Sequence, residues 1–191
     1  MTVAQWIKQN TTSLVGKTVA ITGSTGGLGR ALCRHLAKLG SNLILLDRNE
    51  ARSAEWRNEL LLEFPNINIQ CLRVDLENME SVHQAVTAIK EYSLDILIHN
   101  AGAYKIPRRI CDTGWDNAFQ INFVSPYYIT RSLLPNLRAT HAKVVVVGSI
   151  AHDYSHTDPM DVDFHTRTQA KVIHCLVVLL HLSLKLFRLL F

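Results

Sequence analysis

Between residues 18 and 150, short runs rich in β-branched residues alternate with longer segments of helical character. Alternation of this kind is typical of successive βαβ units, whose strands pair in parallel. The expected strands are 18–22, 42–47, 67–75, 95–99 and 143–148, and the expected helices lie near 27–39, 49–64, 78–93 and 113–138. The sequence therefore predicts an α/β fold with a doubly wound parallel sheet.

The composition limits the classes of protein that this chain can be. Its 191 residues suit one domain, and 48% hydrophobic with 19% charged residues is close to globular averages, which argues against bulk disorder. The net charge of +4 comes from dispersed Lys and Arg, so no nucleic-acid-binding stripe is expected. The four cysteines have neither metal nor redox spacing, and residues 1–17 lack the apolar run of a signal peptide. We therefore expect a cytoplasmic protein with reduced thiols.

The composition changes after Lys171. Residues 172–191 contain no acid, Gly or Pro, and Leu, Val and Phe occupy most positions. A helix here would be apolar around most of its circumference, which requires a larger core, a second copy or a membrane surface. We expect three parts: an N-terminal extension (1–17), a dinucleotide-binding domain (18–171) and an apolar tail (172–191).

A glycine-rich turn follows the first expected strand. The turn reads Thr22-Gly23-Ser24-Thr25-Gly26-Gly27-Leu28-Gly29. Glycines permit a tight turn and let the backbone approach a pyrophosphate, while the free N–H groups of a helix N-terminus attract an anion. Because the turn lies between a strand and a helix inside a βαβ unit, we predict a dinucleotide site there in preference to a purely structural turn.

An acidic residue ends the second expected strand. Asp47 lies 18 residues after Gly29, about where such a fold places the ligand of the adenosine ribose. A carboxylate there accepts hydrogen bonds from ribose hydroxyls and repels a 2′-phosphate, which favours NAD over NADP. Arg48 leaves NADP open, because a guanidinium can pair with that phosphate, although it can also be a solvated surface charge.

These positions and several later ones resemble the short-chain dehydrogenase/reductase family. The spacing Thr22-Gly23-xxx-Gly27-x-Gly29 resembles its cofactor motif. Further resemblances follow in order along the chain. Asp75-Leu76 resembles the pair that contacts adenine, and Asn100-Ala101-Gly102 resembles the NAG motif, with His99 where a further Asn is usual. Asn122 resembles the helix-four Asn, and 146–149 resembles the strand that ends in the active-site Ser. The resemblance covers about two-thirds of a usual member. It implies a Rossmann-type fold, a nicotinamide dinucleotide, and hydride transfer to or from a small carbonyl or alcohol.

Each of these residues also has a structural interpretation. Asn100 and Gly102 can shape a turn, Asp75 can cap the following helix, Asn122 can be a satisfied polar residue in a helix, and Ser149 can be an ordinary loop residue. A common nucleotide site explains all of these positions together, and we prefer it for that reason.

The resemblance implies a catalytic set that this sequence lacks in part. In the family, a Tyr hydroxyl exchanges the proton with the substrate oxygen, and a Lys four residues later lowers the pKa of that Tyr. Ser149 and Asn122 match the Ser that orients the substrate oxygen and the Asn that supports a proton relay. No Tyr-xxx-Lys follows Ser149 in this sequence. We therefore expect an impaired oxidoreductase, with a non-catalytic dinucleotide-binding module or sensor as the alternative.

Three placements of the missing Tyr and Lys can be considered. Tyr154 is followed four residues later by an acid, 167–171 has the Lys but an Arg in place of the Tyr, and His174 occupies a possible Tyr position without the Lys. None of the three is a working dyad. His174 is retained as a catalytic candidate because imidazole titrates near neutral pH.

The later strands of the family are not recognisable after residue 171. A frame shift or truncation near 171–174 explains this loss together with the sudden absence of acids, and a genuine short paralogue is the other explanation. We favour the first, in which the C-terminal strands are missing. The nine histidines show no ligand spacing, so no metal site is expected. The sequence is compatible with homo-oligomerisation. It is also compatible with membrane contact through 172–191, if that segment forms an interfacial helix.

Overall fold

The computed structural model describes residues 2, 5, 9 and 11–149. Its strands form one sheet in the order β3-β2-β1-β4-β5, and every neighbouring pair is parallel. The strands are β1 (Thr18–Thr22), β2 (Asn42–Asp47), β3 (Ile69–Arg73), β4 (Ile96–His99) and β5 (Lys143–Val146). This arrangement confirms the predicted doubly wound α/β fold. The order reverses between β1 and β4, and in such sheets ligands bind beyond the carboxyl ends of the strands at that point.

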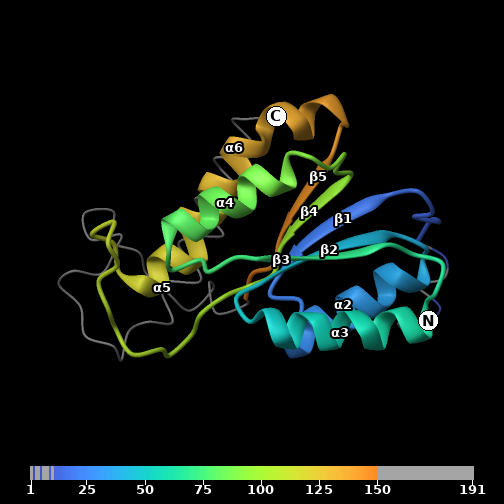
Figure 1. Cartoon of the computed structure of the whole chain (residues 1–191), viewed down its shortest axis with the longest axis horizontal. Helices are drawn as coiled ribbons and strands as arrows, with labels where there is room; N and C mark the ends of the chain where they lie inside the picture. Colours follow the sequence, from blue (N-terminus) through green and yellow to red (C-terminus); the bar gives the residue numbers. More distant parts are fainter. Residues whose placement is uncertain (1, 3–4, 6–8, 10, 150–191) are drawn as a thin grey trace.

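Helices cover both faces of the sheet. Figure 1 shows α2 (Gly27–Lys38) and α3 (Glu50–Glu63) on one face, with α4 (Met79–Ile89) and α6 (Ser125–Ala139) on the other. Asparagine side chains begin two of these helices: Asn49 accepts a hydrogen bond from the main-chain N–H of Arg52, and Asn78 accepts one from Ser81. Such caps satisfy N–H groups that have no partner within the helix.

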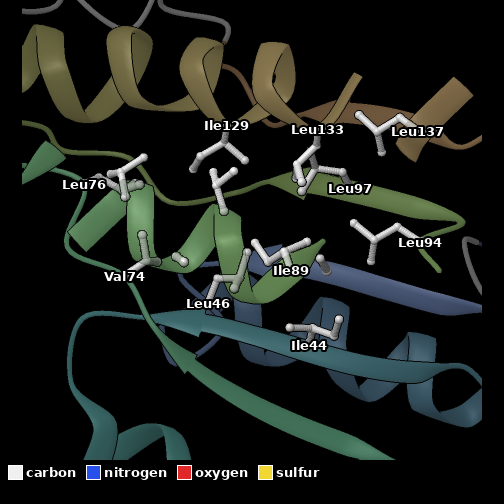
Figure 2. Close-up of a cluster of buried hydrophobic side chains, with 14 residues drawn as sticks. Ile44, Leu46, Val74, Leu76, Ile89, Leu94, Leu97, Ile129, Leu133 and Leu137 are labelled. Carbon is white, nitrogen blue, oxygen red and sulfur yellow. The ribbon is translucent and has the colours of Figure 1, made fainter. Parts of the chain in front are cut away.

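Two apolar cores result from the alternation of side chains along the strands. Even-numbered residues of β2, such as Ile44 and Leu46, pack toward α4 and α6 (Figure 2), whereas odd-numbered ones such as Leu43 and Leu45 pack toward α2 and α3. All four are at most 1% exposed. A strand that is buried on both faces must be apolar throughout, which explains the continuous Leu43–Leu46 run.

The expected helix at 113–138 begins later than predicted and changes geometry on the way. A short helix α5 (Asn117–Phe119) is capped by Asp116, continues through the π-helical turn η1 (Gln120–Val124), and leads directly into α6. Gly114 has a φ of +85°, a conformation that no helix accommodates, so the helical segment begins only after it.

The other differences are at the ends of elements. The strands expected at 67–75 and 143–148 are shorter in the structure, at Ile69–Arg73 and Lys143–Val146. Cys33, Cys71 and Cys111 are free thiols. In the part of the chain that the structure describes, no helix is both long and apolar enough to cross a membrane. The boundary at 171, the tail 172–191 and the expected loss of the later strands concern residues outside the described ones.

Candidate functional site

The glycine-rich turn connects β1 to α2 at the carboxyl edge of the sheet. Gly26 is the N-cap residue of α2, makes no side-chain cap, and is followed by a first helical turn without acidic residues. The positive end of the helix dipole therefore faces the turn without a charged partner in that first helical turn. A Cβ built on Gly27 has no atom within 4 Å, so there is open space in front of the first helical residue.

Two other glycines are required by close backbone contacts. Gly23 has a φ of +68°, and a Cβ there would lie 2.9 Å from Ala101. A Cβ on Gly29 would lie 2.1 Å from the carbonyl oxygen of Gly23. The turn thus folds back onto its own helix and against the segment that follows β4, which only glycine permits at both positions.

Asn100 links this turn to the end of β4. Its side-chain amide donates to the carbonyl oxygens of Thr22 and Gly23 at 3.1 and 3.0 Å. The hydroxyl of Thr22 in turn accepts from the main-chain N–H groups of Asn100 and Ala101 at 3.1 and 3.0 Å. Four hydrogen bonds therefore hold together the two loops that leave β1 and β4.

Asp47 lies at the end of β2 and is only 4% exposed. Its Oδ2 accepts from the hydroxyls of Ser24 and Ser53 at 2.5 and 3.1 Å. Its Oδ1 has only long contacts of 3.3 Å, with the N–H and hydroxyl of Thr25. One oxygen thus anchors the glycine-rich turn and α3, while the other keeps hydrogen-bonding capacity.

Asp75 and Leu76 follow β3. Oδ1 of Asp75 accepts from the main-chain N–H of Glu77 at 3.1 Å, and α4 is capped by Asn78. Asp75 therefore does not cap the following helix, and that alternative is wrong. Leu76 is 7% exposed and packs in the core shown in Figure 2.

These loops enclose a cavity of about 420 Å³, within the usual size range of small-molecule sites. Its walls include seven of the predicted site residues: Gly23, Asp47, Arg48, Asp75, Leu76, Ala101 and Gly102. The other predicted residues of the turn do not line this cavity but shape or flank the turn; they are Thr22, Ser24, Gly27, Leu28 and Gly29. Asn100 lines a neighbouring cavity instead.

This second cavity measures about 170 Å³ and lies nearer to β5. Ala101, Gly102 and Tyr104 line both cavities, so the two adjoin. The walls of the second cavity are His99, Asn100, Ala101, Gly102, Tyr104, Asn122, Pro126, Val146, Val147 and Gly148. Ser149 is half-buried and directly follows Gly148. His174, the third catalytic candidate, lies outside the described residues, as do the other placements of the Tyr and Lys.

Asn122 lies in the π-helical turn η1. Its Oδ1 accepts from the main-chain N–H of Ala103 at 2.8 Å, and its Nδ2 donates to the carbonyl oxygen of Ala103 at 2.9 Å. The amide is thus matched to the N–H and C=O groups of one residue and positions the loop that leaves β4. One N–H and one lone pair of the amide are not used by these two bonds.

His99 is 3% exposed and faces α6. The hydroxyl of Thr130 donates its proton to the carbonyl oxygen of Pro126 at 3.0 Å, so Nε2 of His99 must be the donor in its 2.8 Å contact with Thr130. Nδ1 is then an unprotonated acceptor, and it is buried without a partner among the described residues. Burial lowers the pKa of His99 to about 4.

Several residues around these cavities were not predicted from the sequence. Thr25 and Glu77 line the larger one, and Arg109 pairs with Glu77. Thr25 belongs to the turn itself and lies directly after the predicted residue Ser24. Arg109 lies 32 residues from Glu77 along the chain, so no local pattern could have joined them. Among residues 11–149, no group of three or more metal-ligating side chains is present.

Comparison with known proteins supports the family resemblance of the sequence. A family model described as short chain dehydrogenase matches residues 17–158. A short chain dehydrogenase of Aspergillus sclerotiorum, resG, is 39% identical over 131 residues, which are 67% of this chain and 36% of that protein. Retinol dehydrogenase 13 of Homo sapiens is 30% identical over 171 residues, or 85% of this chain and 50% of that one. The chain thus spans half or less of the length of these curated relatives.

A solved structure supports the fold. The RhlG/NADP active-site complex of Pseudomonas aeruginosa superposes with a TM-score of 0.72 at 24% identity, covering 93% of this chain and 67% of that one. At that identity the likeness concerns the fold alone.

Proposed function

Because this chain belongs to the short-chain dehydrogenase family, we propose that it binds a nicotinamide dinucleotide along the carboxyl ends of its strands and is an NAD(P)-dependent oxidoreductase by descent. The observation that supports the binding most directly is the pair of adjoining cavities, which extend from Asp47 and Asp75 at one end to Asn122 and Gly148 at the other. An elongated ligand of two nucleotides suits such a shape better than a compact one does.

The residues present fit such a ligand. In the proposal, the pyrophosphate lies against the N–H groups at the start of α2, where the space beside Gly27 is open. The adenosine ribose lies at Oδ1 of Asp47, the oxygen with only long contacts, and the adenine lies beside Asp75 and Leu76. Thr22, Ser24 and Asn100 hold the turn in the required shape.

We propose NAD as the preferred cofactor. The carboxylate of Asp47 is buried and close to the proposed ribose position, so a 2′-phosphate would be brought near a negative charge. Arg48, the cation that could offset this repulsion, lies 3.7 Å from the carboxylate of Glu77 and is partly neutralised by it. The name of the Pseudomonas complex shows that a relative of the same fold takes NADP, so the preference of this chain must be measured.

The nicotinamide end of the proposed ligand would occupy the smaller cavity. When bound, the nicotinamide ring would supply or accept the hydride. Ser149 would orient the substrate oxygen, and Asn122 would hold the loop at Ala103 that borders the site. The role of Ser149 is carried over from the family resemblance, which also implies a proton-relay role for Asn122, whereas the loop-holding role of Asn122 follows from its two hydrogen bonds with Ala103. The substrate class is a small to medium carbonyl or alcohol.

Proton transfer is the step for which the fewest of the implied catalytic residues are found in the sequence. The Tyr-xxx-Lys motif that the family resemblance implies, in which the lysine lowers the pKa of the phenol, does not follow Ser149 in this sequence. We propose that catalysis by this chain is impaired for that reason. The same observation favours a second function, that of a dinucleotide-binding module without hydride transfer, such as a sensor of the nicotinamide pool.

One experiment separates these functions. Dinucleotide binding is measured by calorimetry, and consumption of NADH or NADPH is followed with a panel of aldehydes and ketones. Binding with turnover supports the oxidoreductase, and binding without turnover supports the module. If the chain binds neither NAD nor NADP, both proposed functions are overturned.

A further inference from the structure

Glu77 is positioned between two arginines at the rim of the larger cavity. Its Oε2 lies 2.6 Å from Nη2 of Arg109, and its Oε1 lies 3.7 Å from Nη1 of Arg48. The Glu77 side chain is 19% exposed, whereas the side chains of Arg48 and Arg109 are 67% and 64% exposed. A half-buried carboxylate thus contacts the ends of two solvent-exposed cations.

The three residues come from different parts of the fold. Arg48 directly follows β2, Glu77 lies between β3 and α4, and Arg109 belongs to the segment between β4 and α5. The main-chain N–H of Arg109 donates to Oδ1 of Asn117 at 3.1 Å, which fixes the backbone from which this arginine extends. Only the tertiary fold assembles this trio, and two of its members, Arg48 and Glu77, line the cavity.

We infer that Glu77 is a specificity-determining residue for the dinucleotide: by pairing with Arg48 at the ribose end of the cavity, its carboxylate takes the place of a 2′-phosphate and favours a cofactor with a free 2′-hydroxyl. The inference rests on the proposed dinucleotide function. It assigns to this chain a control on cofactor choice that lies outside the glycine-rich turn and the end of β2.

The physical basis is competition between anions for one cation. Arg48 cannot pair fully with Glu77 and with a 2′-phosphate at once. A phosphate bound at Arg48 would also be brought near the Glu77 carboxylate, and like charges within ~4–6 Å disfavour each other. A ribose with a free 2′-hydroxyl carries no charge there, so Glu77 penalises only the phosphorylated cofactor.

Arg109 limits the strength of this effect. Its short contact with Oε2 neutralises part of the Glu77 charge, while the longer contact with Arg48 is the weaker of the two. Removing Arg109 should therefore strengthen the hold of Glu77 on Arg48 and its repulsion of a phosphate. Glu77→Gln and Arg109→Gln should change the ratio of affinities for NADP and NAD in opposite directions.

The test is a calorimetric titration of the full chain with NAD and with NADP. Glu77→Gln should raise the affinity for NADP by about threefold or more, as expected for one partly exposed charge contact, and change the affinity for NAD less than twofold. Arg109→Gln should lower the affinity for NADP relative to NAD. Both shifts should shrink at about 1 M salt, where the Debye length is about 3 Å.

Two controls keep the test specific. Glu80→Gln removes the same charge three residues away, where the side chain is exposed and bonds only with Gln84 among the described residues, and it should leave the affinity ratio unchanged. In an Arg48→Gln background, Glu77→Gln should lose most of its effect, because the shared cation is gone. If Glu77→Gln fails to fold, the opposite shift expected for Arg109→Gln still decides the matter.

The outcomes that overturn the inference are distinct from failure of the proposed function. An unchanged ratio in Glu77→Gln, or equal changes for both cofactors, overturns the role of Glu77 while binding itself stands. A wild-type chain that binds neither cofactor overturns the proposed function, and the role of Glu77 with it.

Discussion

Nδ2 of Asn100 lies 3.0 Å from the carbonyl oxygen of Gly23, and this hydrogen bond joins positions 77 residues apart in the sequence. It connects the loop after β4 to the glycine-rich turn after β1. These two strands are neighbours at the point where the strand order reverses. The candidate site therefore depends on an uncharged side chain of one loop that donates to the main chain of the other.

Replacing Asn100 by Asp should destabilise the protein and weaken dinucleotide binding. The isosteric carboxylate cannot donate, and it would face the carbonyl oxygens of Thr22 and Gly23. We expect a loss of about 1–3 kcal/mol in the free energy of unfolding, measured by urea denaturation. Asn136→Asp, whose amide contacts Lys90 at 3.4 Å in an exposed position, should cost less than about 1 kcal/mol. Equal losses in the two variants would contradict the role assigned to Asn100.

Gly29→Ala and Gly27→Ala should differ in stability although both lie in the first turn of α2. A Cβ at Gly29 would lie 2.1 Å from the carbonyl oxygen of Gly23, whereas one at Gly27 meets nothing within 4 Å. We expect Gly29→Ala to lose about 1–3 kcal/mol in the free energy of unfolding, and Gly27→Ala to be neutral or stabilised by up to about 1 kcal/mol. Thermal unfolding of both variants checks this, and a Gly29→Ala protein as stable as its parent would disprove the contact.

Asp47→Ala should weaken binding of NAD more than that of NADP. The variant removes the proposed acceptor for the ribose hydroxyls and also the negative charge that disfavours a 2′-phosphate. It should in addition cost about 1–3 kcal/mol of stability, because the hydroxyls of Ser24 and Ser53 lose a buried acceptor. Titration with both cofactors is the measurement. Equal loss of affinity for the two would contradict the assignment of this carboxylate.

The free energy of unfolding should fall as the pH is lowered from about 6.5 toward 4. The pKa of His99 is lowered by burial from 6.5 to about 4, so between these values the unfolded chain binds a proton that the folded chain does not. The contribution of the neutral imidazole is complete above the unfolded pKa and is lost as the pH falls, at up to about 1.4 kcal/mol per pH unit.

His99→Asn should remove this part of the pH dependence, because an amide does not titrate. Denaturation curves at several pH values compare the variant with its parent. An identical slope in both proteins would show that His99 is not the group responsible.

The sequence predicted the parts of this protein that depend on local patterns. Alternating apolar runs predicted all five described strands, and the glycine spacing predicted the turn before α2, since φ values and close approaches there demand glycine. It also placed Asp47 at the end of β2. These features are encoded within a few neighbouring residues.

Features that depend on contacts between residues far apart in the chain could not be predicted from local sequence patterns. The helix expected at 113–138 begins after Gly114 and includes a π-helical turn, in which Asn122 bonds with Ala103 across the site. The pairing of Glu77 with Arg109 requires the loop after β4 to return over the end of β3. Neither leaves a periodic signal in the sequence, because the partners are set by the loop paths and not by helix or strand geometry.

Binding of a nicotinamide dinucleotide at the glycine-rich turn is tested by calorimetric titration of wild type and Gly27→Val with NAD. Gly27→Val places a branched side chain at the start of α2, where an added Cβ has no atom within 4 Å. We expect one molecule of NAD bound per wild-type chain, with binding abolished in the variant and its melting temperature close to that of the parent. Unchanged binding in a folded Gly27→Val protein, or no binding of NAD or NADP by wild type, would contradict the claim.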